Sequence, residues 1–428
     1  MRNSDTFFAS VSGREVLKDL YGGEASSADH AVRRYSDLCS SFRDHFKSEA
    51  SALVSVPGRV EIGGNHTDHN HGKVIAGSIS VDAAALCSKN SDMKVVLYDL
   101  AYHEVLTVDL SRLEVDASET GRPEGLIRGV AAGLQQRGFT LGGCNGVLHN
   151  EVLSGSGLSS SAVFEVAIGT IFNVLYNNGT IGPLELAKIG QFAENRYFGK
   201  PCGLMDQCAC ALGGLVYIDF ADPQEPIVER MENYPAGYGL AVVRTGGSHA
   251  GLTDAYAAIP AEMKCAASVC GRRVLRGTSF NELLLKAAVI RKKCGDRAFL
   301  RALHFVTENN RVEEQKKALA SGNTDVFLTL VQESGSSSWK YLQNISPGNE
   351  PFHQGMAAAL AVSEIFIKGK GRGAVRVHGG GFAGTILAFI HDDDMPEYRS
   401  LMETFTGTGS VSTFSIRNRG AAAVQLPA

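Results

Sequence analysis

The sequence predicts an α+β fold of two lobes with a cleft between them. Short runs rich in β-branched residues dominate residues 52–110 and are typical of strands. Apolar helical patterns follow, and a second series of strands and helices begins after a composition change at 219–223. Because no internal repeat or low-complexity linker occurs, we expect an N-terminal lobe over 51–222 and a C-terminal lobe over 223–428.

Residues 1–50 are expected to form a helical extension that packs on the first lobe. The pattern predicts one helix from Arg14 to Tyr21 and another from Ala28 to Ser48, separated by a glycine- and serine-rich stretch. The second helix carries an apolar stripe at spacings of three and four residues, which gives it one face to bury. The stripe consists of Tyr35, Leu38, Phe42 and Phe46.

The first lobe reads as strands followed by two helices. Strands are predicted over 54–60, 74–81 and 94–98, where β-branched residues concentrate. A helix is predicted from Ser160 to Tyr176 and another from Pro183 to Tyr197. The second begins with proline and is followed by glycine, the usual distribution of these two residues at helix ends.

The second lobe is predicted to begin with a strand over 239–244. Helical patterns then run through about residue 320, and a strand–loop–helix series closes the chain. The final strands are predicted over 385–391 and 410–416, where apolar and polar residues alternate well.

The bulk composition is that of an ordinary globular protein. The chain has 428 residues, 44% hydrophobic and 20% charged, with a formal net charge of −4. Without a long basic run there is no electrostatic footprint for nucleic acid, so we expect no such partner. No apolar stretch of about 18 residues is present, as a membrane span requires. The first residues lack the apolar core of a signal peptide, so we expect a cytoplasmic protein.

Nine cysteines are scattered along the chain, and Cys202, Cys208 and Cys210 form the densest group. Their number is odd and no paired CxxC spacing occurs. This pattern predicts reduced cytosolic thiols rather than a disulfide framework or a zinc site.

The most informative segment is the glycine- and serine-rich stretch 154–162. It lies between an alternating, strand-like stretch (146–152) and an apolar helical run, so it precedes a helix N-terminus suited to phosphate. Its glycines let backbone N–H groups close on an anion, and its serines can cap the helix and face phosphate or Mg²⁺. The GxxxxGK[ST] pattern of a P-loop is absent, and the third glycine of a dinucleotide-binding fingerprint is missing.

A polar cluster follows the segment Pro57-Gly58-Arg59-Val60. His66, Asp68, His69 and His71 fall within six positions, which leaves two interpretations open. Such residues can hold a metal ion. They can equally bind sugar hydroxyls after a turn. If the segment is a strand, successive side chains point to opposite faces, which weighs against a shared metal ion.

Asp206 is a candidate functional carboxylate. It stands in the mainly apolar segment 203–207, after a helix that carries Glu194. Burial beside a charged partner would perturb its pKa, and Arg59 is the natural partner.

The segment His378-Gly379-Gly380-Gly381 is similar to the oxyanion segment of lipases and esterases. That function requires a downstream GxSxG nucleophile elbow, which the chain lacks. The glycines are therefore expected to let the backbone of the second lobe approach a nucleotide.

Together these segments resemble the GHMP kinase superfamily, and within it the galactokinase family, over roughly residues 50–425. Residues 57–60 with His66-Thr67-Asp68 resemble the galactokinase signature. The stretch 155–162 resembles the ATP-phosphate loop, and 379–384 resembles the C-terminal glycine motif. Glu194, followed by the segment that contains Asp206, resembles the Mg²⁺ ligand that precedes the active-site aspartate.

The resemblance implies a two-lobed GHMP kinase fold with the active site in the cleft between the lobes. It implies phosphorylation of galactose by ATP at the anomeric C1 hydroxyl, giving galactose 1-phosphate and ADP. Arg59 and Asp206 would flank that hydroxyl, with Asp206 as a base or an electrostatic orienter. Ser161 and Glu194 would hold Mg²⁺. The residues expected to bind ATP are Gly155, Ser156, Gly157, Leu158, Ser159, Ser160, Ser161, Gly380 and Gly381. Those expected to bind the sugar are Arg59, Asn65, His66, Asp68, Gly203, Asp206 and Tyr256.

The sequence departs from the galactokinase pattern at three positions of the signature. Galactokinases commonly have Glu at Asn65, where it contacts O6 of the sugar, Tyr at His69 and Asn at Glu61. A neutral Asn65 would not repel a C6 carboxylate, so a kinase for a C6-modified sugar such as galacturonate is an alternative. A non-catalytic galactose sensor is another, although known sensors are altered in the serine-rich loop, which is intact here.

Overall fold

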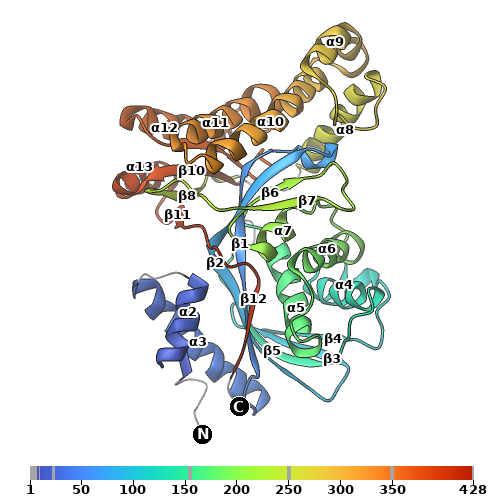
Figure 1. The fold of residues 1–428 in the computed structure, drawn as a ribbon, viewed down its shortest axis with the longest axis vertical. Helices are drawn as coiled ribbons and strands as arrows, with labels where there is room; N and C mark the ends of the chain where they lie inside the picture. The colour runs from blue at the N-terminus through green and yellow to red at the C-terminus, as the bar shows by residue number, and fades with distance from the viewer. Residues whose placement is uncertain are drawn as a thin grey trace.

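The computed structural model describes residues 7–8, 10–21, 25–152, 157–247, 252–347 and 351–426. Figure 1 shows two lobes, each built on its own sheet, with the N-terminal helices set against the lower one. This arrangement agrees with the two-lobed α+β fold that the sequence predicts.

An eight-stranded sheet forms the first lobe in the described part of the chain. Its strands are β1 (Ala52–Gly63), β2 (Lys73–Lys89), β3 (Lys94–Asp99), β4 (Glu104–Asp109), β5 (Cys144–Asn150), β6 (Leu215–Asp219), β7 (Ile227–Met231) and β12 (Ala422–Gln425). The order is β12-β1-β2-β5-β3-β4, with β6 paired to β2 and β7 to β6. The β3/β5 pair is parallel and the others are antiparallel.

The central strands β1 and β2 are longer than the sequence predicts. Their ladder continues past Pro57 because the register shifts between Pro57 and Arg59 and again between Glu61 and Gly63. Such irregularities let a strand bend without losing its partner. Arg59 and Glu61 stay paired with β2 in this bent part of the strand, and Glu61 contacts Arg376 of the second lobe.

Helices cover both faces of this sheet. One face carries α4 (Pro123–Gln136), α5 (Ser160–Tyr176), α6 (Pro183–Ala193) and α7 (Met205–Leu212), and the other carries α2 (Val11–Tyr21) and α3 (Ala25–Phe46) (Figure 1). Helix α5 has the predicted bounds. The second predicted helix changes its winding, because α6 ends at Ala193 and continues as a π-helical turn, η3 (Glu194–Phe198). Single π-turns of this kind are frequent at functional sites.

The N-terminal extension shares a hydrophobic core with the sheet. Most of its apolar stripe is buried together with residues of β1, β2 and β5, and Phe46 is partly buried. The core members from the helices include Leu17, Leu20, Tyr35, Leu38 and Phe42, and those from the sheet include Leu53, Leu86 and Val147.

A four-stranded sheet with helices forms most of the second lobe in the part that the structure describes. Its strands are β8 (Tyr238–Arg244), β9 (Ala374–His378), β10 (Thr385–His391) and β11 (Val411–Phe414), in the order β11-β8-β10-β9. The helices are α8 (Thr253–Val269), α9 (Phe280–Cys294), α10 (Asp296–Ala320), α11 (Thr324–Ser337), α12 (Gly355–Lys370) and α13 (Met395–Thr406). Short turns complete the fold: η1 (Asp68–Asn70), η2 (Ala117–Glu119), η4 (Ser338–Leu342) and η5 (Asp392–Asp394).

A single cut at residue 222 does not separate the lobes. Strand β7 pairs with β6, and β12 pairs with β1, so two segments beyond the cut belong to the first sheet. The chain therefore returns to the N-terminal lobe at its end, and the expected range 223–428 is too simple a boundary. Sequence patterns mark where strands lie but not which sheet receives them.

The expectation that all cysteines are reduced is wrong for one pair. Cys265 on α8 and Cys294 on α9 form a disulfide between neighbouring helices. The two residues lie 29 positions apart, so only the packing of α8 against α9 brings them together. Burial raises the pKa of Cys202, Cys208 and Cys210, which favours their neutral thiol form.

Among the described helices, none has the length and apolar character that crossing a membrane demands.

Candidate active site

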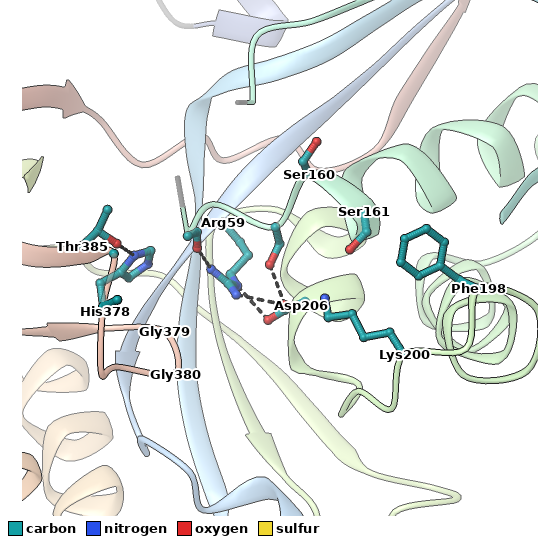
Figure 2. A pocket seen from close by; sticks show the side chains of 14 residues that line it. Arg59, Ser160, Ser161, Phe198, Lys200, Asp206, His378, Gly379, Gly380 and Thr385 are labelled. Atoms are coloured by element: carbon teal, nitrogen blue, oxygen red, sulfur yellow. Dashed lines mark hydrogen bonds and ion pairs between the residues drawn. The ribbon is translucent and has the colours of Figure 1, made fainter. Parts of the chain in front are cut away.

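A cavity of about 340 Å³ lies between the lobes and is lined from both sides. The first lobe contributes Arg59, Gly157, Ser159, Ser160, Ser161, Phe198, Lys200 and Asp206, and the second contributes His378, Gly379, Gly380, Ala383, Gly384 and Thr385. Figure 2 shows Arg59 and Asp206 between the serines of α5 and the His378–Thr385 side of the cleft. Four segments that are far apart in sequence, around Arg59, 157–161, 198–206 and 378–385, therefore meet at one site.

Arg59 and Asp206 form a two-pronged ion pair at the centre of this cleft. Arg59 Nε donates to Asp206 Oδ1 at 2.7 Å, and Nη2 donates to Oδ2 at 2.9 Å. The remaining Arg59 nitrogen, Nη1, donates to the carbonyl of Gly157. This fork geometry fixes both side chains, so the partner expected for Asp206 is confirmed.

Asp206 is held in its charged form. Burial alone would raise its pKa, but Arg59 and a hydrogen bond from Ser159 Oγ outweigh burial and lower the pKa below its usual value. Ser159 itself has a left-handed backbone, with φ of 63°, which is uncommon for a residue other than glycine. Ser159 is the N-cap residue of α5, and in this conformation its hydroxyl donates to Asp206.

The described part of the phosphate loop lies at the N-terminus of α5. Gly157 has a φ of +76°, and a Cβ on it would approach Thr385 Oγ1 of the second lobe at 2.7 Å. Leu158 is buried, and its carbonyl accepts from the Arg59 N–H at 3.3 Å. Ser160 and Ser161 begin the helix and line the cleft. Gly155 and Ser156 lie outside the described residues.

Ser161 and Glu194 lie together, as the expected metal ligands should. Ser161 Oγ donates to Glu194 Oε1 at 2.8 Å, and Gln207 Nε2 donates to Glu194 Oε2 at 2.9 Å. Gln207 also donates to Glu165 at 3.0 Å. Burial, with Glu194 nearby, raises the pKa of Glu165 and favours its uncharged form.

These oxygens suit Mg²⁺, which takes one or two protein oxygens and completes its shell with phosphate and water. Across the described ranges, no three His, Cys, Asp or Glu side chains gather to hold a metal ion by themselves. A metal at Ser161 and Glu194 therefore needs further ligands, and nucleotide phosphates at the N-terminus of α5 are suitable ones.

The predicted sugar-binding loop is held by hydrogen bonds within itself and to the second lobe. His66 Nε2 bonds the carbonyl of Gly380 at 2.9 Å, and its Nδ1 lies 3.0 Å from His69 Nε2. Burial lowers the pKa of His66 to about 3, so it is neutral. A Cβ on Gly203 would lie 2.1 Å from Asp68 Oδ2, which places Asp68 and Gly203 side by side. The structure thus brings His66, Asp68 and Gly203 near one another, while their role in sugar binding stays a prediction.

Asn65 is buried, and its amide is fully engaged. Its Nδ2 donates to Glu61 Oε1 at 2.9 Å and to the carbonyl of Gly379 at 2.8 Å, and its Oδ1 accepts from Asn344 Nδ2 at 2.8 Å. Arg376 completes the cluster by donating to Glu61 at 2.7 Å. Asn65 can contact a sugar only by exchanging one of these partners, so its direct role at C6 stays a prediction.

Tyr256 reaches the site from α8. Its hydroxyl donates to the carbonyl of Gly381 at 2.8 Å, and its ring packs edge-to-face on Phe382. A Cβ on Gly380 would lie 2.6 Å from the Tyr256 ring, so this glycine permits the close approach. Gly380 lines the cleft, whereas Gly381 instead contacts Tyr256 and Asn344.

Four residues that line the cleft were given no role by the sequence analysis: Phe198, Lys200, His378 and Thr385. His378 begins the segment 378–381, but in the sequence only the glycines of that segment indicate a function. For Phe198 and Lys200, the one sequence feature that points to the site is their position between Glu194 and Gly203. His378 is buried, and burial together with Arg59 lowers its pKa well below the usual value.

Comparison with known proteins identifies the family. The GHMP kinase N-terminal domain matches residues 125–214, and the galactokinase galactose-binding signature matches residues 40–89. A galactokinase of Glaesserella parasuis is 31% identical over 362 residues, spanning 84% of this chain and 91% of the relative. The chain belongs to the galactokinase family. A galactokinase of Actinobacillus pleuropneumoniae matches with the same identity and coverage.

Solved structures agree with this membership. The galactokinase of Lactococcus lactis, in complex with galactose, is 26% identical and superposes with a TM-score of 0.76, covering 91% of this chain and 99% of that one. A mevalonate kinase at 14% identity has a TM-score of 0.60, covering 86% and 99%, and shares the fold alone. The galactokinase-family chain is a sugar kinase with the GHMP kinase fold, as the sequence motifs imply.

Proposed function

We propose that the protein transfers the γ-phosphoryl group of ATP to the anomeric C1 hydroxyl of galactose, giving galactose 1-phosphate and ADP. Membership of the galactokinase family supports the reaction. The observation that carries it is the Arg59–Asp206 pair, which lines the cleft and bonds both Gly157 and Ser159 of the phosphate loop. A sugar hydroxyl placed at this pair faces the N-terminus of α5, where phosphate binds best.

In this proposal, the C1 oxygen attacks the γ-phosphorus while the bond from that phosphorus to the β–γ bridging oxygen breaks. The hydroxyl proton passes to Asp206, and ADP leaves with the bridging oxygen. Because its pKa is lowered, Asp206 is a weak base that orients the hydroxyl first and takes the proton late. Arg59 holds Asp206 in place and stabilises negative charge on the transferring group.

Ser161 and Glu194 are the residues proposed to hold Mg²⁺, which when bound neutralises charge on the ATP phosphates. The short distance between the two oxygens and the burial of the Glu194 carboxylate support this role. Backbone N–H groups at the start of α5 and the glycines of 379–384 are proposed to hold the phosphates from opposite sides of the cleft.

The test is a phosphorylation screen of the purified protein with ATP and Mg²⁺. The sugars are galactose, galacturonate, N-acetylgalactosamine, arabinose and glucose, with ADP release as the rate signal. Phosphorus NMR of the product then identifies the phosphorylated oxygen. We expect the highest kcat/KM for galactose and a phosphate on its anomeric oxygen. Absence of sugar-dependent ADP release would favour the non-catalytic sensor, and a preference for galacturonate would favour the C6-modified alternative.

Galactose is preferred over galacturonate in this proposal for a specific reason. The described residues around Asn65 include a carboxylate, Glu61, whose charge is already balanced by Arg376. Both amide hydrogens of Asn65 already donate, to Glu61 and to the carbonyl of Gly379, so Asn65 offers no free donor to a C6 carboxylate. A cytoplasmic location belongs to the same proposal, because the reaction draws on ATP.

A further inference from the structure

We propose that Lys200 binds the γ-phosphoryl group of the nucleotide and, in the empty cleft, serves as the counter-ion of Glu194. The inference rests on the proposed function and adds a phosphate-binding residue to it. Lys200 follows the π-helical turn η3 and lines the same cavity as Asp206 and the serines of α5. Figure 2 shows its side chain extending from its loop toward Asp206.

The ammonium group of Lys200 forms an ion pair with Glu194. Lys200 Nζ lies 3.0 Å from Glu194 Oε1, the same oxygen that accepts from Ser161. The Glu194 side chain is only 3% exposed, so its negative charge needs a partner. The Lys200 side chain is 61% exposed, so solvent can take up its ammonium group when it leaves this contact.

A metal ion at this site and the ammonium group of Lys200 would compete for the same oxygen, Glu194 Oε1. If Ser161 and Glu194 hold Mg²⁺, the ammonium of Lys200 is repelled from Glu194 Oε1. It is then free inside a cleft that must accept a highly charged triphosphate. A lysine ammonium group carries a full positive charge near neutral pH.

The cleft offers few other cations for this task. Among the described residues that line it, Arg59 and Lys200 carry the full positive charges, and His378 is held neutral. Three of the five Arg59 N–H groups are already engaged with Asp206 and Gly157. The chain also lacks the lysine of a P-loop. Lys200 is therefore a second cation, beside Arg59, that can meet the terminal phosphate.

The test compares Lys200→Met, Lys200→Arg and the control Lys188→Met. Lys188 forms a similar pair with Glu225 at 2.9 Å, but it does not line the cleft. Calorimetry with Mg²⁺ and either ADP or a non-hydrolysable ATP analogue separates the γ-phosphate from the rest of the nucleotide. We expect Lys200→Met to bind the analogue about 10–100-fold more weakly, the range typical of a charge-assisted bond, and ADP about equally well.

Two further results are expected. Lys200→Arg recovers much of the analogue affinity, and Lys200→Met needs a lower Mg²⁺ concentration for half-saturation of nucleotide binding because Glu194 has lost its competing partner. A merely structural ion pair would not move these two quantities in opposite directions.

Unchanged analogue affinity in Lys200→Met, or equal weakening of ADP and analogue, would overturn the inference. The sugar reaction is judged separately on the wild-type protein. If the wild type phosphorylates no sugar yet its analogue binding depends on Lys200, the proposed function fails and the phosphate role of Lys200 stands.

Discussion

At the scale of single residues, Arg59 and Asp206 keep each other charged inside a cleft. The fork of two hydrogen bonds fixes the carboxylate, and the lowered pKa keeps it ionised. Such a group orients a hydroxyl well but is a poor base until the new bond has begun to form. The pair therefore contributes mainly through position and charge, as phosphoryl transfer requires.

Asp206→Asn tests this role. We expect turnover to fall about 10²–10⁴-fold, because the amide cannot accept the hydroxyl proton. ATP affinity should remain close to that of the wild type. The unfolding temperature should fall, because Arg59 loses its carboxylate partner.

Asp219→Asn is the matched control. Asp219 forms the same kind of fork with Arg276, at 2.6 and 2.9 Å, away from the cleft. It should lower the unfolding temperature while turnover persists. Near wild-type turnover in Asp206→Asn would remove this residue from the mechanism.

Glu194→Gln tests the metal site. The amide keeps the shape of the side chain but removes the charge that Mg²⁺ prefers, so the Mg²⁺ concentration for half-maximal activity should rise about tenfold or more. A titration of initial rate against Mg²⁺ measures this. Glu225→Gln, which removes a surface carboxylate paired with Lys188, should leave the titration unchanged. Identical curves for Glu194→Gln and the wild type would count against the assignment.

Several site residues could be predicted from their segments, and the reason is local. Arg59, Asp206, Ser161 and Glu194 stand in short motifs whose residue types match the chemistry. Lys200 is a single lysine after a glycine, and a surface residue would read the same way in the sequence. Only the three-dimensional contact with Glu194 distinguishes it.

At the scale of elements, the cleft depends on two loops from different lobes meeting closely. Gly157, before α5, and Thr385, at the start of β10, leave no room for an added side chain between them. The phosphate loop therefore keeps its conformation only while position 157 is glycine.

Gly157→Val should abolish or strongly weaken nucleotide binding while galactose binding persists. The Cβ of the valine would lie only 2.7 Å from Thr385 Oγ1. The valine backbone would also have to adopt a φ of +76°, which is unfavourable for a residue other than glycine. Gly121→Val separates these two causes, because Gly121 has the same φ of +76° but nothing within 4 Å of its Cβ. Calorimetry should find normal ATP affinity in the control. Normal ATP affinity in a folded Gly157→Val protein would contradict the loop assignment.

Elements were easier to predict than their partners. Helix α5 and strand β10 have the predicted bounds, because strong periodic patterns and clear turn residues define them. The return of β12 to β1 and the disulfide between α8 and α9 depend on contacts between distant segments. No local pattern records such contacts, so these features became visible only in the structure.

At the scale of the whole molecule, one buried carboxylate joins the N-terminal extension, the central sheet and the C-terminal segment. Asp82, on β2, accepts from Arg34 Nη1 at 2.5 Å, from Tyr21 at 2.7 Å and from Arg417 at 3.0 Å. Ser55 on β1 donates to the same group. Because these partners come from opposite ends of the chain, the stability of the protein as a unit should depend on Asp82.

The pH dependence of unfolding tests this dependence. Burial would raise the pKa of Asp82, but Arg34 and Arg417 outweigh it and lower the pKa from 3.8 to about 2. A lowered pKa in the folded state gives stability that is complete above about pH 4 and is lost as the pH falls toward 2. The contribution is about 2 kcal/mol, since one pKa unit corresponds to about 1.4 kcal/mol.

Asp82→Asn should therefore be less stable than the wild type by about 3–5 kcal/mol near neutral pH, because it leaves two buried arginines short of a partner. Urea unfolding measures the difference, which should shrink as the pH falls below about 4. Asp37→Asn, an exposed carboxyl on α3, should match the wild type throughout. A difference between wild type and Asp82→Asn that stays constant from pH 7 to pH 3 would show that the charge of Asp82 does not hold the ends of the chain to the sheet.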